Sequence, residues 1–400
     1  MRVSLAPDRQ RVPPPGQGTG CAAMPLLAAG GPRAILGGRA GCDGLVTPIA
    51  ARADTLFGAR GACLAGRGGP LFVCDTGHHR LLIWTRPPES DHVPADLLIG
   101  QPNFLREGRN GKSDVGAATL NVPTGVAAAD GVLAVADAWN HRVLLWHGYP
   151  DTANRGADVV LGQADFAGGL ANRGTDTACA DTLNWCYGVA IADDRLMVAD
   201  TGNRRVLAWD RIPLANGTPA DLVLGQRDLV TRDENAGEGA GALGMRWPHG
   251  VAVADRMILV SDAGNNRIMV WREMPRANGT PCDFVLGQAG PMGLDHNRAA
   301  YFPTAFALNM PYGLAVQGER LVVADTANSR LLGFAMDDIA MGSGATWLAG
   351  QHGFGDKGDN RWGLPVRDSL CWPYDVASCG ETLVIADSGN NRVLLWETAP

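Results

Sequence analysis

One pattern recurs six times along the chain and restricts its fold more than any other feature. Each copy has an Asp, four further residues, an Arg, and then an apolar run that ends in an aromatic residue. The aspartates are Asp75, Asp137, Asp200, Asp262, Asp325 and Asp387, and the differences between successive numbers are 62, 63, 62, 63 and 62. So constant a spacing indicates a repeat architecture.

Every repeat contains short apolar runs bounded by Gly, Asn, Asp or Pro. In the third repeat they are 187–192, 195–200, 205–209 and 221–226. Runs of this length, rich in aliphatic and β-branched residues, are typical of strands rather than helices. Four antiparallel strands in each of six units predict an all-β fold, a six-bladed β-propeller of four-stranded blades.

The last repeat stops at Trp396, before its fourth run. A matching run, 33–40, precedes the first repeat, and its Gly37 lies 63 residues before Gly100 of the next copy (100 − 37). The order predicts that an N-terminal strand completes the sixth blade, which would leave no open edge in the ring. We therefore expect residues 1–30 to be a disordered lead and residues 31–400 to form the propeller.

Composition narrows the classes of function. The net charge of −7 argues against a nucleic-acid partner, which needs a basic surface. No uninterrupted apolar stretch approaches the ~18 residues of a membrane-spanning helix. The nine cysteines form no CxxC pair, so we expect reduced thiols in a cytoplasmic protein. Lys112 and Lys357 are the only lysines among 34 basic residues, which we interpret as the codon usage of a GC-rich bacterial genome.

The repeat resembles the NHL repeat in its D-x-x-N-x-R-[VIL] core and its upstream P-x-G-[VL]-A, and the resemblance covers about residues 33–396. It implies the propeller fold but no single activity, because NHL propellers serve as RNA- and protein-binding modules, sensor domains and a peptidyl-hydroxyglycine lyase.

Residues that recur in every repeat are expected to serve the fold. We expect each Asp to accept backbone N–H groups in its turn and each Arg to pair with a carboxylate or carbonyl groups. The Gln of each Gly-Gln pair is expected to bond the start of the following loop. The aromatic residues that end the third runs are expected to pack in the core; they are Trp84, Trp146, Trp209, Trp271, Phe334 and Trp396.

Function is expected where the repeats differ. The start of the first strand lies beside the propeller axis, and the residues aligned there are Arg60, Thr124, Tyr187, His249, Tyr312 and Tyr374. Phenols combine an apolar face with a polar tip, so this ring predicts a ligand-binding site. The alternative is an aromatic plug that only fills the axis.

Neighbouring positions add two further candidates. Trp185, Trp247 and Trp372 recur two residues before three of the ring positions. Cys186 adjoins Tyr187 and is either a packing thiol or a nucleophile served by His249. Loops of about 20 residues before each first strand are expected to extend the same face and to take part in recognition.

The resemblance also bears on chemistry. The lyase relative binds zinc through histidines of several blades at this ring position, whereas only His249 matches here, so no metal or cofactor is expected. We expect a binding or scaffold protein, rather than an enzyme, that presents its central face to a protein or a small ligand. The alternative is a lyase or hydrolase that uses Tyr187, His249, Tyr312 and Tyr374, with Arg60 holding an anionic group. Oligomeric state stays open.

Overall fold

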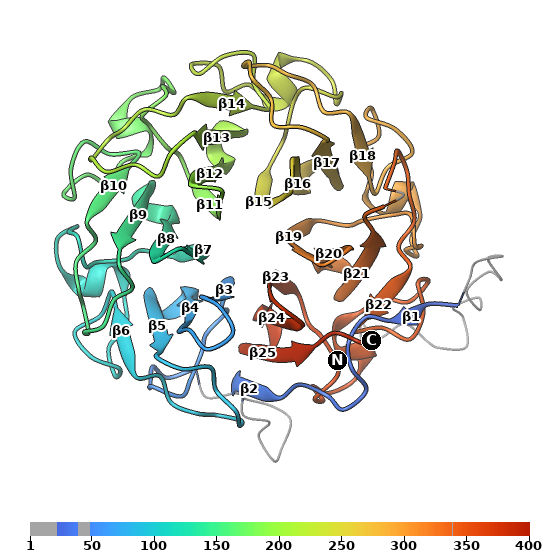
Figure 1. Cartoon of the computed structure of the whole chain (residues 1–400), viewed down its shortest axis with the longest axis horizontal. Coiled ribbons are helices and arrows are strands. Elements are labelled where there is room, and N and C mark those ends of the chain that lie inside the picture. The colour runs from blue at the N-terminus through green and yellow to red at the C-terminus, as the bar shows by residue number, and fades with distance from the viewer. Residues whose placement is uncertain (1–21, 39–48, 338) are drawn as a thin grey trace, which may run out of the picture.

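Six β-sheets stand around a central axis and confirm the predicted six-bladed β-propeller (Figure 1). The structure is a computed structural model that describes residues 22–38, 49–337 and 339–400. Each sheet contains a blade of four strands that pair antiparallel with their neighbours, and the strand that begins each repeat lies innermost.

The first three blades follow one another along the chain. They consist of β3 (Gly61–Leu64), β4 (Leu71–Asp75), β5 (Arg80–Trp84) and β6 (Leu97–Ile99); of β7 (Pro123–Ala129), β8 (Val132–Asp137), β9 (Arg142–His147) and β10 (Val159–Leu161); and of β11 (Cys186–Ala192), β12 (Arg195–Asp200), β13 (Arg205–Trp209) and β14 (Leu222–Leu224).

The remaining three blades complete the ring. They consist of β15 (Pro248–Ala254), β16 (Met257–Asp262), β17 (Arg267–Trp271) and β18 (Phe284–Leu286); of β19 (Pro311–Gln317), β20 (Arg320–Asp325), β21 (Arg330–Ala335) and β22 (Trp347–Ala349); and of β23 (Pro373–Cys379), β24 (Thr382–Asp387) and β25 (Arg392–Glu397), joined by β2 (Ala34–Gly37).

Two kinds of 3-10 turn connect these strands. One follows the repeated Asp between the second and third strands; these turns are η1 (Thr76–His78), η3 (Ala138–Asn140), η5 (Thr201–Asn203), η7 (Ala263–Asn265), η9 (Thr326–Asn328) and η11 (Ser388–Asn390). The other lies in the loop between blades; these are η2 (Arg109–Lys112), η4 (Ala171–Gly174), η6 (Glu234–Gly237), η8 (His296–Ala299) and η10 (Asp359–Trp362). No helix among the described residues is long and apolar enough to cross a membrane.

The core is divided among the interfaces between neighbouring blades. One buried cluster joins Val384 and Val393 of the last blade to Val73 and Leu82 of the first. Five similar clusters lie between the other pairs of blades. Each strand thus buries side chains on both faces of its sheet, which explains why the second and third strands are almost wholly apolar.

Ring closure follows the predicted route. Strand β2 pairs antiparallel with β25, from Ala34 opposite Leu395 to Gly37 opposite Arg392. The final blade therefore takes its outer strand from the N-terminal part of the chain, and the edge of β25 is covered.

The N-terminal lead needs one correction. Residues 1–21 lie outside the described residues, but 22–30, which we expected to be disordered, are ordered. Strand β1 (Met24–Pro25) pairs parallel with β22, and Leu26 is fully buried between the last two blades. The outer strand of the fifth blade offers backbone groups at its edge, and the short apolar run of the lead satisfies them.

We therefore predict that Leu26→Ala costs about 2–5 kcal/mol of unfolding free energy, because it opens a cavity in a packed cluster. Met24→Ala is the matched control, two residues earlier in the same N-terminal segment, since Met24 is 48% exposed, and it should cost less than ~0.5 kcal/mol. Chemical denaturation of both variants tests this. Equal effects would show that the lead does not pack on the propeller.

Candidate functional site

The repeated Asp and Arg form buried pairs that hold each blade together. In every blade the Asp Oδ2 atom accepts a hydrogen bond from the Arg Nε atom at 2.7–2.9 Å. The Arg also donates to backbone carbonyls; Arg142, for example, reaches Phe166, Gly116 and Thr119. The expected structural role is confirmed, because these groups use their hydrogen bonds within the fold.

The same Asp residues also fix the backbone that leads to the axial positions. The Asp Oδ1 atom accepts the backbone N–H of the residue three positions before the ring residue, at 2.6–2.8 Å. In the third blade Asp200 thus holds Asn184, and the chain then carries Tyr187 to the axis. Each Asp anchors the start of an innermost strand.

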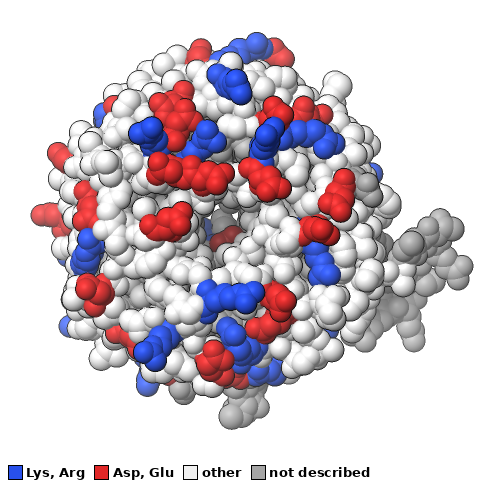
Figure 2. Space-filling model, viewed as in Figure 1, with Lys and Arg blue, Asp and Glu red and all other residues white. Residues whose placement is uncertain are grey.

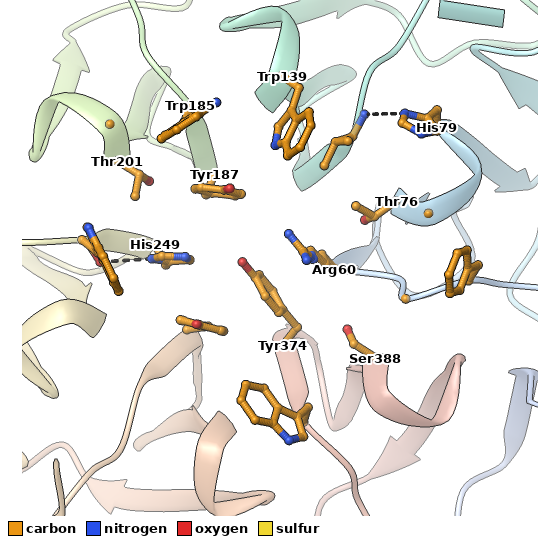
Figure 3. Close-up of a pocket in the computed structure, with 18 of the residues that line it drawn as sticks. Arg60, Thr76, His79, Trp139, Trp185, Tyr187, Thr201, His249, Tyr374 and Ser388 are labelled. Atoms are coloured by element: carbon orange, nitrogen blue, oxygen red, sulfur yellow. Dashed lines mark hydrogen bonds between the residues drawn. The ribbon is translucent and has the colours of Figure 1, made fainter. Parts of the chain in front are cut away.

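Five of the six predicted ring residues surround a cavity of about 760 Å³ at the centre of one face: Arg60, Tyr187, His249, Tyr312 and Tyr374. Figure 3 shows Arg60, Tyr187, His249 and Tyr374 directed toward a common centre. The sixth, Thr124, is buried and does not line the cavity; its hydroxyl donates to the carbonyl oxygen of Tyr187 at 2.8 Å.

The five side chains, called the axial ring below, form a continuous series of contacts, in which Tyr187, His249 and Tyr312 are stacked and Tyr374 is tilted against Tyr312. The ring centroids of Tyr187 and His249 lie 4.9 Å apart, those of His249 and Tyr312 lie 4.3 Å apart, and those of Tyr312 and Tyr374 lie 4.5 Å apart. The Arg60 Cζ atom lies 4.9 Å from the centroid of Tyr374. Such offset contacts between aromatic rings and guanidinium groups are favourable.

The axial ring also separates two cavities. A smaller one of about 250 Å³ lies on its far side, and all five ring residues contribute to both. The blades follow one another clockwise in Figure 1 and anticlockwise in Figure 3, so the two figures view the propeller from opposite faces. Figure 2 has the view of Figure 1 and therefore shows the face of the smaller cavity, where charged side chains surround a central hollow. Among the described residues, Asp375 is the only acid that lines the smaller cavity.

Asp375 follows Tyr374 at a position where the other five blades have Gly. Burial raises the pKa of its carboxyl to about 7, opposed by hydrogen bonds from the backbone of Val376 and Ala62. It lines the cavity on the far side of the axial ring and is absent from the lining of the larger one. The larger cavity therefore does not have this acid as a partner for its cations.

His249 is a neutral hydrogen-bond acceptor at the floor of the larger cavity. It is 8% exposed, and burial lowers the pKa of its imidazole to about 4, with the charge of Arg60 acting in the same direction. Its Nδ1 atom lies 3.0 Å from the Trp247 carbonyl oxygen, which can only accept, so Nδ1 carries the proton. The Nε2 atom is left with a free lone pair.

The phenols of Tyr312 and Tyr374 are hydrogen-bond donors over the whole physiological range. Burial raises the pKa of Tyr312 and Tyr374, although the nearby charge of Arg60 lowers both. Their hydroxyl groups stay protonated and can donate to an acceptor in the cavity.

Large aromatic side chains form the mouth of the cavity and are 40–48% exposed: Phe57, Trp139, Trp185, Trp247 and Trp372. The repeat pattern predicted the last three. Trp139 and Phe57 were not predicted: Trp139 occupies a turn position taken by Gly or Ala in the other blades, and Phe57 is aligned with Asn in three of them. Departures from the repeat at these two positions were the available signal.

Backbone clamps link the mouth of each blade to the blade before it. In five blades the residue two positions before the ring has a φ of 46–55° and donates its backbone N–H to a side chain of the preceding turn. The acceptors, called clamp residues below, are Asn391, His79, His141, Asn266 and Ser329. Burial lowers the pKa of His141 to about 4, which keeps this clamp residue neutral and able to accept.

The charged side chains that line the larger cavity are all positive among the described residues. No Asp or Glu occurs among the described residues that line it, whereas Arg60 and Arg204 do. The backbone N–H of Arg60 donates to the Cys74 carbonyl oxygen, but its guanidinium makes no hydrogen bond or ion pair with any described residue and contacts the Tyr374 ring. An unpaired guanidinium at the floor of an aromatic cavity is suited to bind a carboxylate or phosphate.

Two other expectations are settled by the geometry. Cys186 is fully buried, burial raises the pKa of its thiol, and its Sγ atom lies 3.1 Å from the Arg142 carbonyl oxygen, so it is a packing thiol. The Gln residues bond the following loop as predicted; Gln163, for example, donates to Leu170 at 2.9 Å.

The long loops between blades were expected to extend the central face, but their 3-10 turns lie away from the larger cavity. They pack over the repeated Arg, and none of the residues of η2, η4, η6, η8 or η10 lines the larger cavity. Within the described part of the chain, no three His, Cys, Asp or Glu side chains gather into a group that could hold a metal ion.

Comparisons with known proteins identify the repeat. A family model described as NHL repeat matches residues 120–144, within the second blade. No match is found among curated proteins. Hydrazine synthase from Kuenenia stuttgartiensis is similar in structure, with a TM-score of 0.48 and 12% sequence identity over 89% of this chain and 99% of that one.

A structural-genomics protein of unknown function from Bacteroides thetaiotaomicron VPI-5482 is similar to the same degree. Its TM-score is 0.48 at 13% sequence identity, and the alignment covers 86% of this chain and 70% of that one. Neither similarity assigns a ligand or an activity to this chain.

The stability of the axial ring distinguishes a binding site from a packed plug. Trp271 is 1% exposed and donates from Nε1 to Thr280, so Trp271→Ala should cost about 3–5 kcal/mol. Tyr312 is only half-buried beside the cavity, so Tyr312→Ala should cost no more than about 2 kcal/mol. Urea denaturation of the two variants is the measurement, and equal costs would identify the ring as a plug.

The buried imidazole makes stability depend on pH. His249 binds a proton near pH 6.5 when unfolded but only near pH 4 when folded, so its contribution is complete above the higher value and is lost as the pH falls. We predict that His249→Gln removes on the order of 2–3 kcal/mol of the stability loss between about pH 7 and pH 4. His296→Gln, at an exposed site, is the control and should leave this pH dependence unchanged.

Proposed function

We propose that this chain, which belongs to the NHL-repeat six-bladed β-propellers, is a binding protein that holds a small anionic ligand in the larger cavity of its central face. Protein-binding scaffolds are common in this class of propeller, and a protein partner is the other form that the proposal could take. The chemistry of the cavity favours the small ligand.

The unpaired guanidinium of Arg60 is the observation that carries this proposal. It lies at the floor of a cavity whose described lining residues include no acid, although the chain has 41 Asp and Glu residues. A partly buried charge without a counter-charge is costly, and a carboxylate or phosphate of a ligand would compensate it. The hydroxyl groups of Tyr312 and Tyr374 would add neutral donors to the same anion.

The size and walls of the cavity suit a small molecule with a flat apolar body. Its volume of about 760 Å³ is within the usual range of ligand pockets. The exposed faces of Trp185, Trp247 and Trp372 would cover such a body, and aromatic side chains lose little conformational entropy when they do so. Neutral His249 would accept one hydrogen bond from the ligand.

The enzymatic alternative is less well supported. His249 has an Nε2 atom that could act as a base beside Tyr187 and Tyr312, but a pKa of about 4 makes it a weak one at neutral pH. Cys186 is buried and does not line the cavity. We place the protein in the cytoplasm, in keeping with the free thiols of all seven described cysteines.

Calorimetric titration with benzoate and its uncharged analogue benzamide tests the proposal. We expect wild type to prefer benzoate, and Arg60→Gln to lower benzoate affinity about tenfold or more while changing benzamide little. Arg60→Lys should restore part of the preference, since it restores the charge.

Arg109→Gln is the matched control for loss of charge. Arg109 is exposed on η2, close enough to His79 to lower its pKa, and does not line the cavity. This variant should bind benzoate like wild type. Absence of any preference for benzoate, or equal losses in the two variants, would contradict an anion site at Arg60.

A further inference from the structure

One blade does not supply the clamp residue that accepts a backbone N–H from the next blade at the mouth of the cavity. The position is the left-handed residue after the 3-10 turn, which is an acceptor in five blades and Arg204 in the third. Arg has five donors and no acceptor, so it cannot receive a backbone N–H. The third blade has therefore lost a structural interaction that every other blade keeps.

The consequence is visible in the next blade. The backbone N–H of Trp247 lies 3.4 Å from Oδ1 of Asp262, which Arg246 already uses at 2.8 Å. Trp247 does not have the positive φ of its counterparts in the other five blades. Arg204 thus changes the backbone of the cavity mouth and replaces a good hydrogen bond by a long one.

Arg204 gains no comparable interaction in exchange. It donates from one guanidinium nitrogen to the carbonyl oxygens of Arg232 at 3.1 Å and Gly202 at 3.4 Å. Its Nε atom is buried without a hydrogen-bond partner, and no described carboxylate pairs with it. Glu234 is close to this blade but pairs with Arg246 at 3.3 Å.

A residue that breaks the repeat, lines the cavity and carries a guanidinium charge without a carboxylate partner among the described residues is expected to act on a ligand. We propose that Arg204 is a second anion anchor at the mouth of the cavity, so that the ligand carries two acidic groups. One would bind Arg60 at the floor and the other Arg204 at the rim, with the apolar body between them. This inference rests on the proposed function of the same cavity.

Dicarboxylates and monocarboxylates of matched shape distinguish two anion anchors from a single anchor at Arg60. The probes are terephthalate and a longer biphenyl dicarboxylate, each compared with its monocarboxylate by calorimetric titration. We expect at least one dicarboxylate to bind about tenfold or more tightly than its monocarboxylate, and Arg204→Asn to remove this difference while leaving the monocarboxylate unchanged.

The substitution Arg204→Asn is chosen because Asn is the clamp residue at Asn266 and Asn391. It offers an acceptor to Trp247, so the melting temperature should not fall, and a loss of affinity would not reflect unfolding. Arg204→Lys keeps the charge without supplying an acceptor and should retain part of the preference. Arg109→Asn should retain all of it.

The outcomes separate the two proposals. If Arg60→Gln weakens benzoate binding but no dicarboxylate binds better than its monocarboxylate, or if Arg204→Asn leaves the preference intact, the second anchor is wrong and the first stands. If none of the carboxylates binds wild type, both are wrong.

Discussion

The buried Asp–Arg pair is the interaction on which the rest of this propeller depends. Taking two charges out of water is costly, and the cost is offset only when the remaining hydrogen-bonding groups are satisfied as well. Here one Asp oxygen binds the Arg and the other binds the backbone at the start of the innermost strand. Asp200, for example, joins Arg205 to Asn184. Each pair thus positions both the blade and the axial residue that follows.

The innermost strands lie so close together that five of the six blades leave no room for a side chain at the position directly after the axial residue. A Cβ atom added to Gly188 would lie 1.9 Å from the His249 carbonyl oxygen, and one added to Gly61 would lie 2.0 Å from that of Thr124. Glycine at this position lets adjacent blades approach. Asp375 is the exception, and it fills the space beside Gly313 with a carboxyl held by backbone N–H groups.

Periodicity made the fold and the axial ring predictable, whereas contacts between blades were not. The repeat spacing located every blade and placed Arg60, Tyr187, His249, Tyr312 and Tyr374 at the axis. It did not reveal that Thr124 bonds backward to Tyr187, or that His141 accepts from Trp185 across a blade boundary. Such bonds join residues 44 or 63 positions apart, and a single sequence carries no periodic signal for them. The order at Leu26 was missed for the same reason.

The cavity lacks six-fold symmetry because the six blades carry different residues at their equivalent axial positions. Tyr187, His249, Tyr312 and Tyr374 come from four successive blades and form one aromatic arc, while the remaining two blades contribute Arg60 and buried Thr124. The cavity floor is therefore apolar along the arc and cationic beside Tyr374. A six-fold scaffold with identical residues would bind a ligand in six equivalent orientations. Because the side chains break that symmetry at the axis, while the Asp–Arg pairs preserve it farther out, the fold can define one orientation for a ligand without altering the Asp–Arg pairs that hold its blades together.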